Sequence, residues 1–281
     1  MSNHLPKITI GMTSFYARET IARAIESALG QDYPNKEILI VDDCSEDDSV
    51  EVIRRAINGV SYARLIVHEK NTGFAGALNT IIANADGDFL VIFDDDDVSH
   101  PERLSRQLDR ILRYEADYKT DLVLCHAARV QTYENGYERY EKTVGTDIGK
   151  APNGSIMAER ILTGNLGSYG SNIVGSCANC ARMGRTEIFR KFGGFDSTMR
   201  RAEDTDFSIR FALAGGHFIG IADPLVHQTM TGGAEKSVDA EEIAETKVFK
   251  KHEAFLRNIG WHDFVRDWMA IRYAYFRNQW G

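Results

Sequence analysis

Four consecutive aspartates, Asp94, Asp95, Asp96 and Asp97, directly follow the apolar run FLVIF at 89–93. Adjacent carboxylates repel one another, and burying them without compensation is very costly. A divalent cation removes this conflict, and hard oxygen ligands suit Mg²⁺ or Mn²⁺. Alternate side chains of an extended segment point the same way, so we expect Asp94 and Asp96 to face one ligand. The alternative is a solvated acidic turn ahead of the next helix.

Polar side chains also follow the first two apolar segments of the chain. Thr13 and Ser14 come after the first, and Asp42 and Asp43 after the second. Asp43 can accept a hydrogen bond from a nucleobase or a ribose hydroxyl, and Phe15 can stack on a base. Taken singly, each is more typical of a turn or a helix cap. Three polar strand ends at one edge favour a binding site.

The elements that position these residues alternate in type over the first 115 residues. Short, almost wholly apolar segments predict strands, and apolar residues at spacings of three and four predict amphipathic helices. The predicted strands are 8–12, 37–41, 63–67 and 89–93, and helices lie between them and after Pro101. This pattern is typical of a parallel sheet covered by helices on both faces, which binds ligands along the carboxyl ends of its strands.

The second half of the chain is less regular. A further strand is expected at 122–130, and residues 131–175 are expected to be loops over a site because their periodicity is weak. A short helix should end at 188–192, and Phe207 and Phe211 lie on one face of another helix. One continuous α/β domain is the simplest description.

Composition narrows the class of protein. The 281 residues are 43% hydrophobic and 26% charged, which is ordinary globular usage, and the net charge of -8 argues against a nucleic-acid-binding surface. We see no signal peptide and no apolar run long enough to span a membrane. The four cysteines fit a reducing cytosol. Cys177 and Cys180 form a lone CxxC, better interpreted as buried thiols than as a zinc or redox site.

Taken together, four segments resemble the GT-A-fold glycosyltransferases of family 2, over roughly residues 5–230. They occur in the family's order, and the combination is more specific than any one of them. The segments are TSFYARETIARAIESALGQDYPNKEILIVDD, NTGFAGALN, DFLVIFDDDDVSHPERL and GGFDSTMRRAEDTDFSIRFALAGG.

The resemblance implies roles for particular residues. Thr13, Phe15 and Asp43 would hold the nucleoside of a nucleotide-sugar donor. Asp94 and Asp95 would lie near the ribose and metal.

On the same resemblance, Asp96 would bind the Mn²⁺ or Mg²⁺ that bridges the donor's diphosphate, and Asp204 would be the catalytic base. His227 falls where some members place a metal or phosphate ligand, although a lone histidine near a strand end is more often a structural hydrogen-bonder. Asp204 also has a structural alternative, because an acidic residue favours the start of a helix, and Asp206 competes for either role.

One departure from the family pattern concerns the diphosphate. Leu78 stands where the family frequently has an arginine. The positive charge would then have to come from elsewhere, with four candidates: Arg182, Arg185, Arg200 and Arg201.

The reaction implied is inverting transfer of a sugar, by default from a UDP-sugar, to the hydroxyl of a glycan or lipid-linked glycan in bacterial-type polysaccharide or glycoconjugate synthesis. The GT-A domain would cover 1–235, with a nucleotide-sugar half at 5–115 and an acceptor half at 116–235. Neither alternative, a nucleotidyltransferase or a non-catalytic carbohydrate-binding module, accounts for Asp43, the four aspartates and Glu203–Asp204 together.

The last segment, 236–281, is expected to be an amphipathic helical extension. Aromatic and apolar residues recur at helical spacing from Trp261 to Phe276, with arginines among them. Such a helix is typical either of a peripheral contact with the inner face of a membrane or of a helix packed on protein. We expect a cytoplasmic protein. The oligomeric state, the sugar and the linkage stay open.

Overall fold

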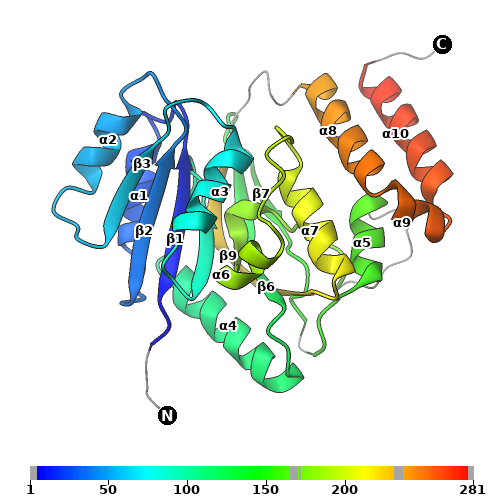
Figure 1. Cartoon of the computed structure of the whole chain (residues 1–281), viewed down its shortest axis with the longest axis horizontal. Helices are drawn as coiled ribbons and strands as arrows, with labels where there is room; N and C mark the ends of the chain where they lie inside the picture. Colours follow the sequence, from blue (N-terminus) through cyan, green and yellow to red (C-terminus); the bar gives the residue numbers. More distant parts are fainter. Residues whose placement is uncertain (1–4, 148, 165–169, 171, 231–236, 278–281) are drawn as a thin grey trace.

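The computed structural model describes residues 5–147, 149–164, 170, 172–230 and 237–277. These residues form a nine-stranded sheet in the order β3-β2-β1-β4-β8-β6-β9-β5, with β7 paired to β6. Helices cover both faces of the sheet (Figure 1). The strands are β1 (Ile8–Ser14), β2 (Lys36–Asp42), β3 (Ala63–Val67), β4 (Phe89–Phe93), β5 (Val98–Ser99), β6 (Val123–Tyr133), β7 (Glu138–Glu141), β8 (Arg182–Arg185) and β9 (His217–Met230).

The N-terminal half of the sheet is parallel, as the sequence predicted. Strand β1 pairs in parallel with β2 and β4, and β2 pairs in parallel with β3. Strand β1 runs two residues further than predicted, because Thr13 and Ser14 continue the register with β2 as far as Asp42. Both residues are therefore buried at the end of a central strand.

Two apolar layers hold the sheet. On one face, α1 (Ile21–Leu29), α2 (Ser49–Ala56) and α4 (Arg103–Tyr118) pack on the strands. On the other face lie α3 (Phe74–Asn84), α5 (Ser155–Leu162), α6 (Thr186–Lys191) and α7 (Glu203–Leu213). Successive residues of β4 alternate between the two layers, which is why its sequence is continuously apolar.

The second half of the sheet is mixed. Strand β8 runs antiparallel to both β4 and β6, whereas β9 is parallel to β6. The expectation of loops throughout 131–175 is wrong, since this region contains β7 and α5. Strand β7 is a mostly exposed hairpin strand, so its sequence lacks the apolar alternation that marks a strand. Helix α5 is only eight residues long, too short for a clear period.

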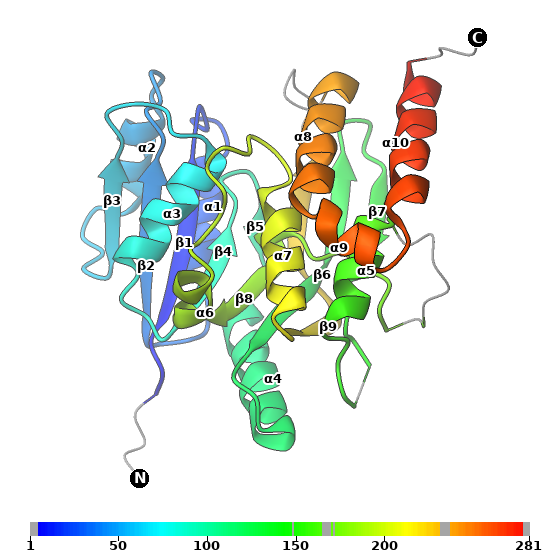
Figure 2. The ribbon, with the colours of Figure 1, turned by 45° about the vertical axis from the view of Figure 1, so that its right-hand side comes forward.

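The C-terminal extension consists of α8 (Val238–Lys251), α9 (Glu253–Asn258) and α10 (His262–Phe276). Helices α8 and α10 stand side by side, with α8 on the side nearer α7 (Figures 1 and 2). Gly260, with a φ of 77°, makes the turn between α9 and α10. Lys251 Nζ and His252 Nε2 contact the Asp206 carboxylate of α7 at 3.0 and 2.9 Å. Within the described residues, no helix is long and apolar enough to cross a membrane.

Candidate active site

The polar strand ends meet along one edge of the parallel half of the sheet. The backbone N–H of Phe15, just beyond β1, donates a hydrogen bond to Asp95 Oδ2 at 3.1 Å. Arg23 Nη2, from α1, donates to the backbone carbonyl of Asp96 at 2.7 Å and to Thr229 Oγ1 of β9 at 2.9 Å. The aspartate run is therefore fixed between the first strand, the first helix and the last strand.

The four aspartates form a turn between β4 and β5. Our premise of an extended segment, on which Asp94 and Asp96 were paired, is therefore wrong. Residues at the two ends of a four-residue turn approach each other. Accordingly, ligand atoms of Asp94, Asp97 and Cys180 lie within 4.8 Å of one another.

The pKa values of three aspartates in this turn are strongly shifted. Burial, with a contribution from neighbouring aspartates, raises the pKa of Asp94 and Asp95 to about 7 and that of Asp97 to about 8. Asp94 Oδ1 and Asp97 Oδ2 are buried without a hydrogen-bond partner in the described structure. Buried, unpaired carboxylate oxygens are what a hard divalent cation would satisfy, so the donor set fits Mn²⁺ or Mg²⁺. The carboxylate of Asp96 also acts electrostatically on Asp94, Asp95 and Asp97.

Asp43 is the centre of a hydrogen-bond network. Its Oδ1 accepts bonds from the N–H and hydroxyl of Thr72, both at 2.8 Å, and contacts His68 Nδ1 at 2.8 Å. Its Oδ2 accepts from the N–H of Gly73 at 2.7 Å. Burial alone would raise the pKa of Asp43, but these hydrogen bonds outweigh it and lower the pKa. Asp43 thus fastens the loop before α3 to the end of β2, and its nucleoside contact stays a prediction.

The predicted base-stacking residue lies on the surface at this edge. Phe15 is 46% exposed, and its ring meets that of Tyr16 edge-on, with the centroids 4.5 Å apart. Thr13, near the end of β1, is buried. This edge therefore carries an exposed aromatic side chain, Phe15, and a buried hydroxyl-bearing residue, Thr13.

Asp204 lies in the first turn of α7 and lines a cavity. Its Oδ1 accepts a hydrogen bond from the N–H of Thr205 at 2.7 Å. Asp204 therefore also serves the start of the helix, which is the structural role given above as the alternative to a catalytic one. Its charge contributes to raising the pKa of Asp94, which puts the two carboxylates within electrostatic reach. Burial, followed by the charge of Asp204, raises the pKa of Glu203 to about 8.

Asp206, the alternative candidate for the catalytic base, has a structural role. Its carboxylate is fully buried and binds Arg210, Lys251 and His252. His227 is exposed on β9, opposite Val98 of β5. Because the next residue, Gln228, turns its amide toward Cys180, His227 points to the other face of the sheet. Its role as a ligand stays a prediction.

The four arginines considered as sources of positive charge lie in different surroundings. Arg182 is fully buried and donates to Ser208 Oγ at 2.7 Å, and Arg185 forms a two-pronged pair with Glu115. Arg201 pairs with Glu241 at 3.7 Å. Arg200 is the one of the four that reaches the loop held by Asp43, where its Nη1 donates to Asn71 Oδ1 at 3.0 Å. Leu78 is buried in α3, within the apolar layer on one face of the sheet.

Sequence reasoning missed the buried cations and the thiol beside the aspartates. Arg103 and Arg129 act electrostatically on Asp94, and Arg129 donates to Cys180 Sγ at 3.2 Å. Arg129 carried a usable signal, because a charged residue inside an apolar strand needs a partner. Arg103 did not, since an arginine at the start of an amphipathic helix normally faces water.

Comparison with known proteins agrees with this geometry. The profile of glycosyl transferase family 2 matches residues 9–193. The succinoglycan biosynthesis protein ExoO of Rhizobium meliloti is 36% identical over 106 residues, 38% of this chain and 30% of ExoO. The putative glycosyltransferase EpsE of Bacillus subtilis is 27% identical over 218 residues, 76% of this chain and 69% of EpsE. The chain thus spans less than a third of ExoO and about two thirds of EpsE.

Solved structures share the fold at low identity. S. aureus TarS 1-349 in complex with UDP-GlcNAc has a TM-score of 0.61 at 17% identity, covering 86% of this chain and 66% of that one. The mannosyltransferase PcManGT from Pyrobaculum calidifontis, in complex with GDP-Man and Mn²⁺, has a TM-score of 0.61 at 16% identity, covering 97% and 74%. With most of its sheet and its aspartate turn inside the matched region, this chain belongs to glycosyltransferase family 2.

Proposed function

We propose that this protein transfers a sugar from a nucleotide-diphosphate sugar, with UDP favoured, to an acceptor hydroxyl with inversion at the anomeric carbon. The observation that carries the proposal is the position of Asp204, which lines a cavity, while the adjacent Glu203 accepts a hydrogen bond from Asn179, the neighbour of Cys180 in the cluster with Asp94 and Asp97. A base between a donor site and an acceptor cavity is what direct transfer requires. The family membership and the nucleotide-sugar complexes of TarS and PcManGT support it.

The donor would lie along the edge formed by β1, β2 and β4. Phe15 would stack on the base, with Thr13 and Asp43 on the nucleoside and Asp94 and Asp95 near the ribose. Asp96, with Asp94 beside it, would hold Mn²⁺ or Mg²⁺, and the ion would supply positive charge to the diphosphate. His227 is a second candidate ligand. The unpartnered oxygens of Asp94 and Asp97 support a cation here.

The acceptor hydroxyl is a poor nucleophile and must lose its proton as it attacks. Asp204 would accept that proton, since it is half-buried and lines the cavity. Attack from the face opposite the leaving phosphate gives inversion. Relatives named for succinoglycan and colanic acid biosynthesis support a role in polysaccharide or glycoconjugate synthesis, with a glycan or lipid-linked glycan as acceptor.

Calorimetry with UDP, GDP, dTDP and CMP, first with Mn²⁺ and then with EDTA, tests the donor half. One diphosphate should bind in a metal-dependent way, and Asp96→Ala should lose that binding. Asp109→Ala, an exposed aspartate paired with Arg113 on α4, is the control and should bind normally. Metal-independent binding, or none to any nucleotide, would refute the proposed donor site.

Asp204→Asn tests the base. The variant should bind the nucleotide as the wild type does, yet turn over the donor at least about a hundredfold more slowly, the lower range expected for loss of a general base. Asp239→Asn changes an exposed carboxylate on α8 and should leave turnover intact. Turnover of Asp204→Asn at the wild-type rate would overturn the assignment.

A further inference from the structure

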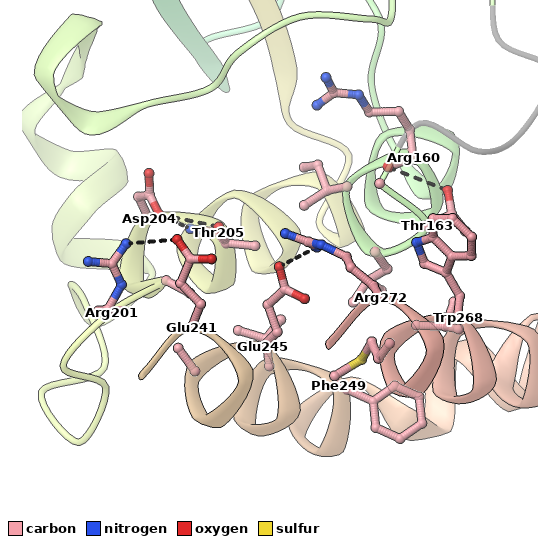
Figure 3. A pocket seen from close by; sticks show the side chains of 18 of the residues that line it. Arg160, Thr163, Arg201, Asp204, Thr205, Glu241, Glu245, Phe249, Trp268 and Arg272 are labelled. Carbon is pink, nitrogen blue, oxygen red and sulfur yellow. Dashed lines mark hydrogen bonds and ion pairs between the residues drawn. The ribbon is translucent and has the colours of Figure 1, made fainter. Parts of the chain in front are cut away.

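The cavity that Asp204 lines is built largely by the C-terminal helices. It has a volume of about 410 Å³ and lies between the start of α7, the end of α5, and α8 and α10 (Figure 3). This size falls within the range of roughly 300–1,000 Å³ that is typical of small-ligand sites. A catalytic domain ending at β9 would lack most of its wall.

Aromatic and apolar side chains form one part of the wall. Trp268 of α10 and Phe249 of α8 line the cavity (Figure 3). Phe264 and Met269 of α10 also line it. Trp268 is 40% exposed and Phe264 45% exposed, which are high values for large apolar residues. An open cavity lined with aromatic rings suits a ligand that has an apolar face of its own.

Two ion pairs form the other part of the wall. Arg272 Nη1 of α10 donates to Glu245 Oε1 of α8 at 2.8 Å, and Arg201 contacts Glu241 of α8 at 3.7 Å. Arg160 also lines the cavity, and the three arginines are balanced by three carboxylates, those of Glu241, Glu245 and Asp204, so the lining has no excess positive charge for a phosphate. It does offer several donors and acceptors to a neutral molecule with many hydroxyl groups.

Asp204 stands at the end of this wall, next to Arg201 and Glu241 (Figure 3). We propose that the cavity binds a short neutral segment of the acceptor glycan, with one sugar ring against Trp268 and the attacking hydroxyl of the segment directed at Asp204. Glu241 and Glu245, with their arginines, bind the remaining hydroxyls. This inference rests on the proposed function, and it makes α8 and α10 part of the acceptor site.

The packing of the helices agrees with this role. Asp206 lies two residues after Asp204 in α7. It binds Lys251 and His252 at the end of α8 and so fixes that end to α7. The Arg272–Glu245 pair fixes α10 to α8. The aromatic wall thus keeps a constant distance from the proposed base, which a site for positioning a nucleophile needs.

The test uses methyl glycosides of glucose, galactose, mannose and N-acetylglucosamine as probes. Saturation-transfer NMR on the full chain, with UDP and Mn²⁺ present, should show binding of at least one glycoside. Trp268→Ala should weaken it at least tenfold, and Trp268→Phe should restore most of it. Tyr275→Ala removes an exposed aromatic of the same helix that does not line the cavity, and should bind as the wild type does.

Glu241→Ala provides a second route that leaves the aromatic wall intact, and it should also weaken binding at least tenfold. Nucleotide binding, measured by calorimetry, should be unchanged in all four variants. If no glycoside binds, or if binding survives both Trp268→Ala and Glu241→Ala, the sugar site is refuted even where the nucleotide binds normally. Failure of the wild type to bind any nucleotide would instead refute the proposed donor function.

Discussion

The N–H of Phe15 donates to Asp95 Oδ2 at 3.1 Å across a separation of 80 residues. One partner follows β1 and the other belongs to the aspartate turn after β4, so the bond joins two neighbouring strand ends. Under the proposed function, the same bond connects Phe15, which stacks on the nucleobase, to the aspartate turn, which holds the metal. The position of the nucleoside is then coupled to that of the diphosphate.

Asp95→Ala should therefore weaken UDP binding by up to about tenfold, because a typical hydrogen bond contributes about 0.5–1.5 kcal/mol. Asp95→Asn keeps an oxygen acceptor for the N–H of Phe15 and should keep most of the affinity. Calorimetry in the presence of Mn²⁺ measures both. Equal losses in the two variants would mean that the charge of Asp95, rather than its hydrogen bond, is what matters.

Asp43→Ala should destabilise the fold by about 3 kcal/mol, since it leaves the N–H groups of Thr72 and Gly73 without their acceptor. Urea denaturation measures the change. Glu69→Ala, an exposed residue in the same loop before α3, should differ from the wild type by less than about 0.5 kcal/mol. An Asp43→Ala variant as stable as the control would show that water replaces the network.

The N-terminal half of the fold could be predicted because its signals are local. In α1, the buried residues Ile21, Ala24, Ile25 and Ala28 are those that the periodicity selects, and β4 is apolar throughout. The edge that carries Phe15 and Asp43 then follows from strand direction alone.

The site's finer geometry could not be predicted in this way. Asp94 meets Asp97 because the run turns, and Cys180 joins them because β8 runs antiparallel beside β4, which no local pattern of residues 177–185 indicates. Helix α5 and strand β7 were missed for a related reason, since the residues they bury are few.

Asp206 should make stability depend on acid pH. Burial would raise the pKa of Asp206, but hydrogen bonds from His252, Lys251 and Arg210 lower it to about 2. The unfolded value is about 3.9, so the contribution is complete above about pH 4 and is lost as the pH falls toward 2. Asp206→Asn should cost about 3 kcal/mol at pH 7, and less as the pH falls through this window.

Urea denaturation between pH 7 and pH 2 measures this difference. Asp109→Asn is the control, because Asp109 pairs with Arg113 at the exposed surface of α4. We expect its cost to stay below about 1 kcal/mol at pH 7, as for other exposed pairs. A constant cost of Asp206→Asn from pH 7 to pH 2 would contradict the depressed pKa of Asp206.

Arg103 should be irreplaceable even by lysine. The side chain is fully buried, and its three nitrogens donate to Gln107 Oε1, Ser99 Oγ and the carbonyl of Ile92 at 2.9–3.0 Å. The single ammonium of Arg103→Lys cannot reproduce this fork, so we expect a loss of about 3 kcal/mol in urea denaturation. Ile92 and Ser99 flank the aspartate turn, so Mn²⁺-dependent UDP affinity should also fall. Arg106→Lys makes the same change at an exposed ion pair on the same helix, and equal losses in the two variants would contradict the argument.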